Sequence, residues 1–188
     1  MKFYFYEKTP AYGRGDTDRL ILESLRQYAA ETARFLPPDV TVRRSPLGKP
    51  YLPEFSPALF VGVTHTDKTV VIAFDEKPFG IDCESNSRRV RRRESVMRRF
   101  FSEKEQQYVR LGTYASDALE TYDRSDMAIN RRFLEIWVKK EAYVKYLGIG
   151  LAALASADTF TIDQTTGYFE KIPHGDDILY YFRPSGKG

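Results

Sequence analysis

The sequence is poor in several features whose absence is informative. Its 188 residues include one cysteine, so no internal disulfide can form and nothing points to an oxidising compartment. No apolar run reaches the roughly 20 residues that a membrane-spanning helix needs. The first segment meets Glu7 and Pro10 too early for the apolar stretch of a secretory signal. These absences predict a cytoplasmic protein that does not enter a membrane.

Charge is present in ordinary amounts but is unevenly distributed. Charged residues make up 29% and hydrophobic residues 42% of the chain, as in a typical globular domain, and the formal net charge is +3. Seven arginines nevertheless fall within the segment "RRVRRRESVMRR" at 88–99. Such a segment is either a solvated helix face or a surface for nucleic acid, a phosphorylated ligand or an acidic protein. The residues alone leave these interpretations open.

The apolar pattern predicts strands that alternate with helices. Strands are expected at 1–7, 40–44, 59–65, 70–74, 79–84, 159–162, 168–172 and 178–182. Helices are expected at 16–35, 87–108 and 133–147, and a loop with partial helix at 112–131. Ser102 and Glu105 form a capping-box pattern that starts a second helix within 87–108. The strand at 70–74 should pair with the next one across a turn, and the predicted class is α+β.

The segment "FGIDCE" at 79–84 places two carboxylates one residue apart in a strand. Because side chains alternate faces along a strand, Asp82 and Glu84 should point the same way and Cys83 the opposite way. A solvated strand end would explain this pair. A hard divalent cation would also explain it, since paired carboxylates are the usual oxygen ligands of Mg²⁺. Both interpretations remain open from these residues.

The helix expected at 133–147 contains polar residues on its apolar side. Lys140 falls in the middle of the apolar face, Glu141 lies at its edge, and Lys145 follows Glu141 by one turn. A Glu141–Lys145 pair contributes only about 0.2–0.5 kcal/mol and leaves Lys140 without a partner. A site that binds a metal and phosphates accounts for all three, with Glu141 as ligand and the two lysines as cations. We therefore favour a functional site on this helix.

Two weaker candidates precede these segments. Lys49 lies between a glycine and a proline in "LGKPYLP", which makes it a fixed cation suited to an anion. His65 lies between Thr64 and Thr66, whose hydroxyls could complete a phosphate cradle. A lysine in such a turn and a lone histidine are also common in purely structural roles. Each signal is weak by itself, and their order along the chain is more informative.

That order resembles a known family. The segments "GKPYLP", "FVGVTHTDKTVVIAF", "FGIDCE", "FFSEKE" and "WVKKEAYVKYLGIGL" follow one another as in the 4′-phosphopantetheinyl transferases of the Sfp type. The likeness spans about residues 45–151. It implies the pseudo-dimer fold of that family, in which two similar α+β halves, here 1–86 and 87–188, enclose the active site between them.

The resemblance also implies a catalytic and metal-binding set. Asp82, Glu84 and Glu141 correspond to the family's carboxylate ligands of Mg²⁺ or Mn²⁺. Lys145 corresponds to the helix lysine that contacts the coenzyme A phosphates and assists proton transfer. Glu105 corresponds to a glutamate that takes part through a water molecule. The base that deprotonates the nucleophile is Glu141, Glu105 or a metal-bound water, and the resemblance does not decide among them.

A second implied set binds the nucleotide end of coenzyme A. It consists of Arg14, Lys49, Thr64 and His65, together with Lys145, and the alignment at Arg14 is looser than elsewhere. Threonines replace the family's serines on both sides of His65. A threonine keeps the hydroxyl and adds a methyl group, so phosphate binding should survive with slightly altered packing.

The implied reaction transfers 4′-phosphopantetheine from coenzyme A to a serine of an apo acyl or peptidyl carrier protein and releases 3′,5′-ADP. Carrier proteins are typically acidic, so the arginine segment is expected to guide the carrier. A monomer that binds no nucleic acid is expected. Two other functional classes are less consistent with the sequence. A nucleic-acid-binding module would need an aromatic-basic recognition motif, which the sequence does not contain. An inactive scaffold would be expected to have lost one of the carboxylates or Lys145, and all of them are present.

Overall fold

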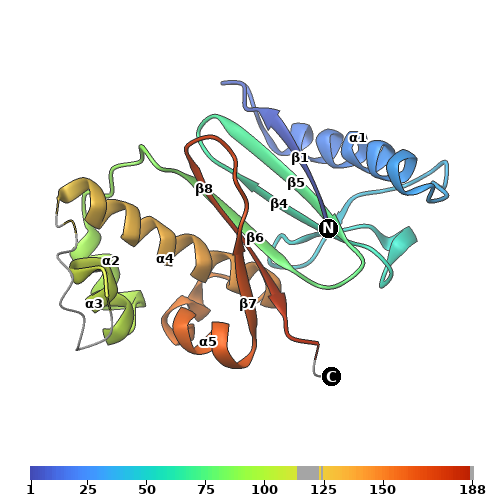
Figure 1. Ribbon diagram of the computed structural model, residues 1–188. Coiled ribbons are helices and arrows are strands. Elements are labelled where there is room, and N and C mark those ends of the chain that lie inside the picture. Colours follow the sequence, from blue (N-terminus) through green and yellow to red (C-terminus); the bar gives the residue numbers. More distant parts are fainter. Residues whose placement is uncertain (114–122, 124, 187–188) are drawn as a thin grey trace.

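The computed structural model describes residues 1–113, 123 and 125–186 (Figure 1). In this part of the chain, two antiparallel sheets of three strands form the centre of the molecule. The first sheet has the order β1 (Lys2–Glu7), β5 (Thr69–Asp75), β4 (Phe60–His65). The second has the order β6 (Gly80–Ser85), β8 (Asp177–Pro184), β7 (Gly167–Lys171). The α+β class is therefore confirmed.

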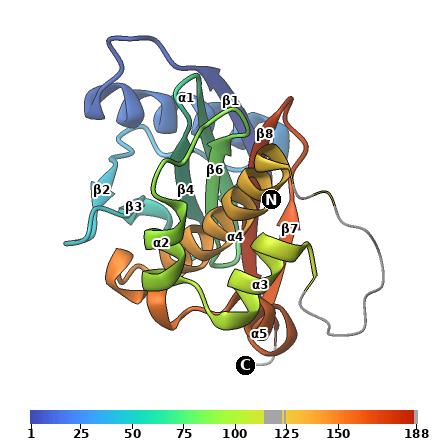
Figure 2. The same ribbon diagram turned by 90° about the vertical axis from the view of Figure 1, so that its left-hand side faces the viewer.

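A long helix covers the outer face of each sheet. The helix α1 (Arg14–Thr32) packs Ile21 and Leu25 against the apolar side chains of the first sheet. The helix α4 (Asp126–Leu147) packs against β6 and β8 and lies in front of them in Figure 2. The inner faces of the two sheets meet in a third apolar cluster that includes Val71, Ile81 and Leu179. Burial of these faces is the main source of stability.

Shorter elements complete the described chain. They are β2 (Arg43–Arg44), β3 (Pro50–Tyr51), a 3₁₀ turn at Pro53–Phe55, α2 (Arg93–Phe100), α3 (Glu103–Leu111), a 3₁₀ turn at Leu151–Ser156 and α5 (Thr159–Thr165). The capping box is confirmed, because Ser102 accepts from the Glu105 amide and Glu105 accepts from the Ser102 amide. The stop at Gly148 is also confirmed, since this glycine ends α4 with φ at +68°.

Three predictions about elements were wrong. Residues 159–162 begin the helix α5 instead of a strand, because Asp158 caps it by accepting from the Thr161 amide. The strands at 70–74 and 79–84 do not pair, since β5 lies between β1 and β4 while β6 pairs with β8. Residues 87–92 precede α2 and are not helical. Half of the 112–131 segment, residues 114–122 and 124, lies outside the described residues, and 126–131 form the start of α4.

The strands β4 and β6 lie side by side although they belong to different sheets. The hydroxyl of Thr64 on β4 bonds both the side chain of Asp82 and the amide of Cys83 on β6. Gly80 allows α4 to pack directly on β6, because a Cβ there would lie 1.9 Å from the Ala142 carbonyl oxygen. The end of α4 is thereby brought next to the carboxylates of β6.

The predicted boundary after residue 86 lies close to a change of sheet. The strand β6 ends at Ser85 but pairs with β8, so residues 80–85 share a sheet with the C-terminal segment. Whether the two sheets represent two similar halves stays a prediction. Among the described residues, no helix has the length and apolar character needed to cross a membrane.

Candidate functional site

A polar cavity of about 440 Å³ lies where β4, β6 and the last turns of α4 meet. It brings together most of the side chains that the sequence singled out. The predicted site residues that line it are Thr64, His65, Asp82, Glu84, Glu141 and Lys145. They come from three elements that are far apart in sequence, so their meeting is a property of the tertiary fold.

Asp82 is the most connected carboxylate in this cavity. Its Oδ1 accepts from the Thr64 hydroxyl at 2.9 Å and from the Lys145 amine at 2.6 Å. Only 6% of the Asp82 side chain is exposed, compared with 38% for Lys145. Burial alone would lower the pKa of Lys145, but the Asp82 carboxylate outweighs this effect and raises it. Lys145 is therefore a cation that is held in place on the wall of the cavity.

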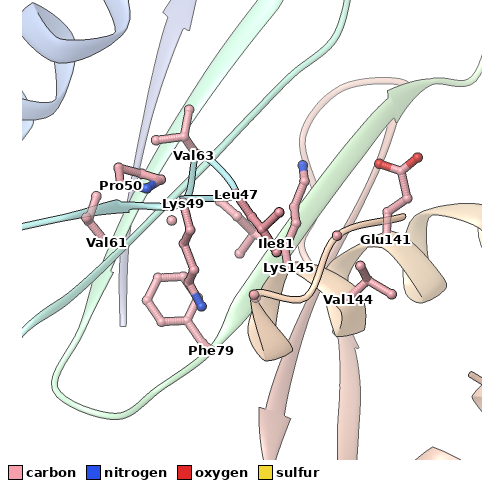
Figure 3. Close-up of a pocket in the computed structure, with 15 residues that line it drawn as sticks. Leu47, Lys49, Pro50, Val61, Val63, Phe79, Ile81, Glu141, Val144 and Lys145 are labelled. Atoms are coloured by element: carbon pink, nitrogen blue, oxygen red, sulfur yellow. The ribbon is translucent and has the colours of Figure 1, made fainter. Parts of the chain in front are cut away.

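Glu141 faces the same cavity from α4. Burial and the nearby Asp82 carboxylate raise the pKa of Glu141 to about 7. A cation bound in this cavity would therefore stabilise the ionised form of the Glu141 carboxyl group. Figure 3 shows the carboxylate of Glu141 and the amine of Lys145 pointing toward the same end of the site.

The three predicted metal ligands line one cavity without converging on one point. Within the described residues, no three acidic, histidine or cysteine side chains form a group that could hold a metal ion. Asp82 contacts Lys145, and Glu84 forms an ion pair with Arg88. The donor set nevertheless suits a hard divalent cation, since carboxylates from β6 and α4 face one space and Glu141 experiences the negative charge of Asp82.

Lys49 points away from these carboxylates. Its Nζ donates to the carbonyl oxygen of Tyr146 at 2.9 Å, in the last turn of α4. The side chain lines a second, mostly apolar cavity of about 270 Å³ that adjoins the polar one. In Figure 3 the Lys49 amine lies beside Phe79, at the end opposite to the Lys145 amine. Burial lowers the pKa of Lys49. Whether Lys49 contacts the nucleotide end of coenzyme A stays a prediction.

Sequence reasoning missed two basic residues near His65. Lys8 places its Nζ 3.3 Å from Nδ1 of His65. Arg44 forms an ion pair with Asp18, and both cations line a cavity of about 320 Å³ that adjoins the polar one. Burial, with the charges of Lys8 and Lys145, lowers the pKa of His65. Lys8 follows the first strand and Arg44 precedes the "GKP" loop, but no local pattern separates them from other surface cations.

Glu105 does not line the polar cavity, and the structure does not describe the side chain of Arg14. Arg14 is the first residue of α1, and its side chain lies outside what the structure describes. Glu105 is fully buried and accepts from the amine of Lys140 at 2.8 Å and from the amide of Thr159 at 2.8 Å. Whether Glu105 acts through a water molecule stays a prediction.

The expected role of Lys140 as a cation of the site was wrong. Its side chain is fully buried and pairs with Glu105, and it also donates to the carbonyl of Ala157. Burial lowers the pKa of Lys140, and the Glu105 carboxylate offsets part of this effect. The pair connects α3, α4 and the start of α5. The unusual lysine on the apolar face is thus explained by a distant partner.

The arginine segment is partly engaged in ion pairs. Arg88 pairs with Glu84, and both Arg89 and Arg93 pair with Asp126 at the start of α4. Other members of the segment are exposed, namely Arg91, Arg92, Arg98 and Arg99. Cys83 is buried in the cluster between the sheets, and burial raises its pKa to about 12.

A family model described as the 4′-phosphopantetheinyl transferase superfamily matches residues 78–184. A phosphopantetheinyl transferase of a Thraustochytrium species is 27% identical over 150 residues, which are 76% of this chain and 50% of the relative. The 4′-phosphopantetheinyl transferase Sfp of Bacillus subtilis is 28% identical over 159 residues, which are 84% of this chain and 61% of the relative.

A further 4′-phosphopantetheinyl transferase from Bacillus subtilis is 29% identical over 158 residues, or 84% of this chain and 61% of the relative. The chain thus spans between half and about three fifths of the length of these curated relatives. The family model covers more than half of the chain and includes β6 and α4, which carry the carboxylates and Lys145. The chain belongs to the 4′-phosphopantetheinyl transferase superfamily.

Proposed function

We propose that this protein transfers the 4′-phosphopantetheine group of coenzyme A to a serine of an apo acyl or peptidyl carrier protein. The serine oxygen bonds to the phosphorus of the phosphopantetheine group, the bond from that phosphorus to the bridging oxygen breaks, and 3′,5′-ADP leaves. The observation that carries the proposal is the polar cavity in which Asp82, Glu141 and Lys145 meet. These residues lie in the segment that the superfamily model matches.

Asp82, Glu84 and Glu141 would hold the divalent cation, Mg²⁺ or Mn²⁺. When bound, such a cation supplies charge neutralisation for the pyrophosphate of coenzyme A. The carboxylates come from β6 and α4, and the Thr64 hydroxyl orients Asp82 by donating to its Oδ1. The choice between Mg²⁺ and Mn²⁺ is an experimental question that metal titration answers.

The cations of the cavity would bind the phosphates. Lys145 is available on the cavity wall, and it stabilises negative charge that develops on the phosphate oxygens. His65, with the neighbouring Lys8 and Arg44, would meet the phosphates of the nucleotide end. Arg14 at the start of α1 is a further proposed ligand of that end.

Of the two side chains considered as bases, Glu141 is the better placed. It lines the cavity where the serine must approach, whereas Glu105 is enclosed by Lys140 and backbone amides. Glu141 would take the serine proton at one of its carboxylate oxygens, provided that this group is ionised. A water-linked role for Glu105 would require a path that the described contacts do not supply.

The fold of the proposed enzyme would be a pseudo-dimer in one chain. The two halves would be 1–86 and 87–188, with β6 at the end of the first half paired to β8 of the second, and the site would lie where β4 and β6 meet α4. A cytoplasmic monomer is proposed with it. The partner would be the carrier protein, and exposed arginines of the 88–99 segment would attract its acidic surface.

The test is transfer to a panel of apo carrier proteins from fatty acid, polyketide and peptide synthesis. Each carrier is incubated with coenzyme A and either Mg²⁺ or Mn²⁺, and intact masses are measured. A carrier with its serine changed to alanine is the matched control. The proposal requires a gain of one phosphopantetheine group on at least one carrier, none on its control, and release of 3′,5′-ADP. No gain on any carrier with either metal would contradict it.

A further inference from the structure

Glu84, one of the three predicted metal ligands, has a cation as its direct partner. It lies next to the last residue of β6 and lines both the polar cavity and a further cavity of about 520 Å³. Arg88 lines that further cavity, and its guanidinium pairs with Oε1 of Glu84. The Glu84 side chain is 18% exposed and the Arg88 side chain 53% exposed. The ion pair therefore lies at the rim of the candidate site, within reach of solvent and ions.

The backbone at Arg88 is held on both sides of its α-carbon. Its amide donates to the Ser85 carbonyl at 2.9 Å, which closes a turn directly after β6. Its carbonyl accepts from Nδ2 of Asn130, a buried residue of α4, at 2.8 Å. The Val90 amide donates to Oδ1 of the same Asn130 side chain at 3.3 Å. These bonds fix the point from which the Arg88 side chain extends, so its position beside Glu84 follows from the fold.

Arg88 also acts on a second carboxylate of the site. Burial and the Asp82 carboxylate raise the pKa of Glu141 to about 7, and the charges of Lys145 and Arg88 act in the opposite direction. Arg88 thus brings positive charge to two of the three carboxylates, to Glu84 by direct pairing and to Glu141 through space. Lys145 pairs with the third, Asp82. The two cations together offset most of the negative charge of the three carboxylates.

A divalent cation bound by these carboxylates would meet Arg88 as a competitor. The guanidinium occupies an oxygen of Glu84 that the cation would also use, and its positive charge repels a second cation nearby. A partly exposed ion pair contributes little to stability, so the guanidinium can turn toward solvent when another cation takes Glu84. The displacement and the repulsion both reduce the affinity of the carboxylates for that cation.

We propose that Arg88 limits the affinity of Asp82, Glu84 and Glu141 for their divalent cation by sharing the Glu84 carboxylate. The proposal rests on the proposed function, which assigns that cation to the three carboxylates. Carboxylates that hold a cation weakly retain it mainly when substrate phosphates add ligands and negative charge. Arg88 would thus set the concentration of cation at which the enzyme becomes active.

Three variants test the proposal. Arg88→Gln removes the positive charge and keeps a polar side chain, whereas Arg88→Lys keeps a cation. Arg131→Gln, at an exposed residue of α4, is the matched control for loss of one arginine charge. For each protein we would titrate Mn²⁺ without coenzyme A or carrier and follow the free ion by electron paramagnetic resonance. Thermal unfolding with and without Mn²⁺ gives a second measure that does not depend on turnover.

For Arg88→Gln we expect the dissociation constant for Mn²⁺ to fall about 3- to 10-fold, because competition and repulsion at Glu84 are removed. The rise in melting temperature that Mn²⁺ causes should exceed that of the wild type, since tighter binding stabilises the folded protein further. Arg88→Lys and Arg131→Gln should stay within about twofold of the wild type, because each keeps a cation beside Glu84. With coenzyme A and a carrier, the Mn²⁺ concentration that gives half-maximal transfer should fall in Arg88→Gln alone.

An unchanged or weaker affinity of Arg88→Gln for Mn²⁺ would overturn the proposal. An equal gain in Arg131→Gln would also overturn it, since net charge and not the Glu84 pair would then control the affinity. If neither the wild type nor Arg88→Gln bound Mn²⁺, the proposal would be rejected together with the proposed cation site. Failure of the transfer reaction alone looks different: the wild type would modify no carrier, while Arg88→Gln would still bind Mn²⁺ more tightly.

Discussion

The amine of Lys145 lies 2.6 Å from Oδ1 of Asp82, so a cation from α4 and a carboxylate from β6 meet inside the polar cavity. The same Asp82 oxygen accepts from the Thr64 hydroxyl of β4 at 2.9 Å. Three elements are thus joined at one carboxylate oxygen. Because Asp82 is almost fully buried, it is not the solvated strand-end group that the sequence left open as an interpretation.

Asp82→Asn should abolish transfer while the protein remains folded. The amide is nearly isosteric and its oxygen still accepts from Thr64, but it removes the charge that a cation and Lys145 require. We expect at least about a 100-fold loss of kcat and a change in unfolding free energy within about 1–3 kcal/mol. Carrier mass gain and urea denaturation measure the two effects. Turnover close to that of the wild type would exclude Asp82 from the proposed metal site.

Thr64→Val should reduce both stability and activity. The valine has the same shape but leaves Asp82 Oδ1 and the Cys83 amide without the hydroxyl that now bonds them. The expected loss is about 1–3 kcal/mol in unfolding free energy, measured by chemical denaturation, with a lower kcat. Thr64→Ser is the matched control, since it restores the residue type of the family and keeps the hydroxyl. Wild-type stability and activity in Thr64→Val would show that the hydroxyl does not matter.

The Lys140–Glu105 pair predicts a strongly non-additive double variant. Lys140→Met or Glu105→Gln alone leaves one buried charge without its partner and should cost about 3–5 kcal/mol of stability. The double variant should cost clearly less than the sum, because no charge remains buried. The unfolding free energies of the wild type, the two single variants and the double variant together give the coupling free energy between Lys140 and Glu105.

The same double variant tests the role of Glu105 in catalysis. If Glu105 is only structural, the double variant should transfer phosphopantetheine at a rate close to that of the wild type. Loss of transfer in a folded and stable double variant would support the water-linked role that the family resemblance implied. Circular dichroism and thermal melting establish that the protein tested is folded.

Exposed arginines of the 88–99 segment should raise the association rate with an acidic carrier. Arg91→Glu combined with Arg92→Glu is the suitable change, because Arg93 is only 20% exposed and pairs with Asp126. KM for the carrier should rise and KM for coenzyme A should stay unchanged, since long-range attraction acts on the protein partner. Added salt screens such attraction over about 10 Å at 0.1 M. Wild-type transfer should therefore weaken with salt, and the variant should lose this sensitivity.

If the two arginines are only solvated surface residues, the variant will show normal carrier kinetics and the same response to salt. Docking would then have to lie elsewhere, and the segment after Gly150 is the next place to examine. Lys104→Glu, on the exposed face of α3, is the matched control for charge reversal away from the segment.

Local patterns determined the elements that carry the site. The apolar period over 133–147 predicted the helix that became α4, and Gly148 predicted its end. Alternation along "FGIDCE" predicted a strand with Asp82 and Glu84 on one side, and both line the polar cavity. These properties depend on residues a few positions apart, so they can be inferred from the chain alone.

Partners that are distant in sequence were decided only by the tertiary structure. Lys140 was expected to serve the site because its own helix offers it no partner, yet Glu105 on α3 supplies one. The amine of Lys49 lies at the Tyr146 carbonyl, 97 positions away, and no pattern near Lys49 predicted this partner. The strand expected at 159–162 became α5, because the cap of Asp158 and packing outweighed β-branched side chains. Periodicity records which face of an element is apolar, and it contains no information on which distant element covers that face.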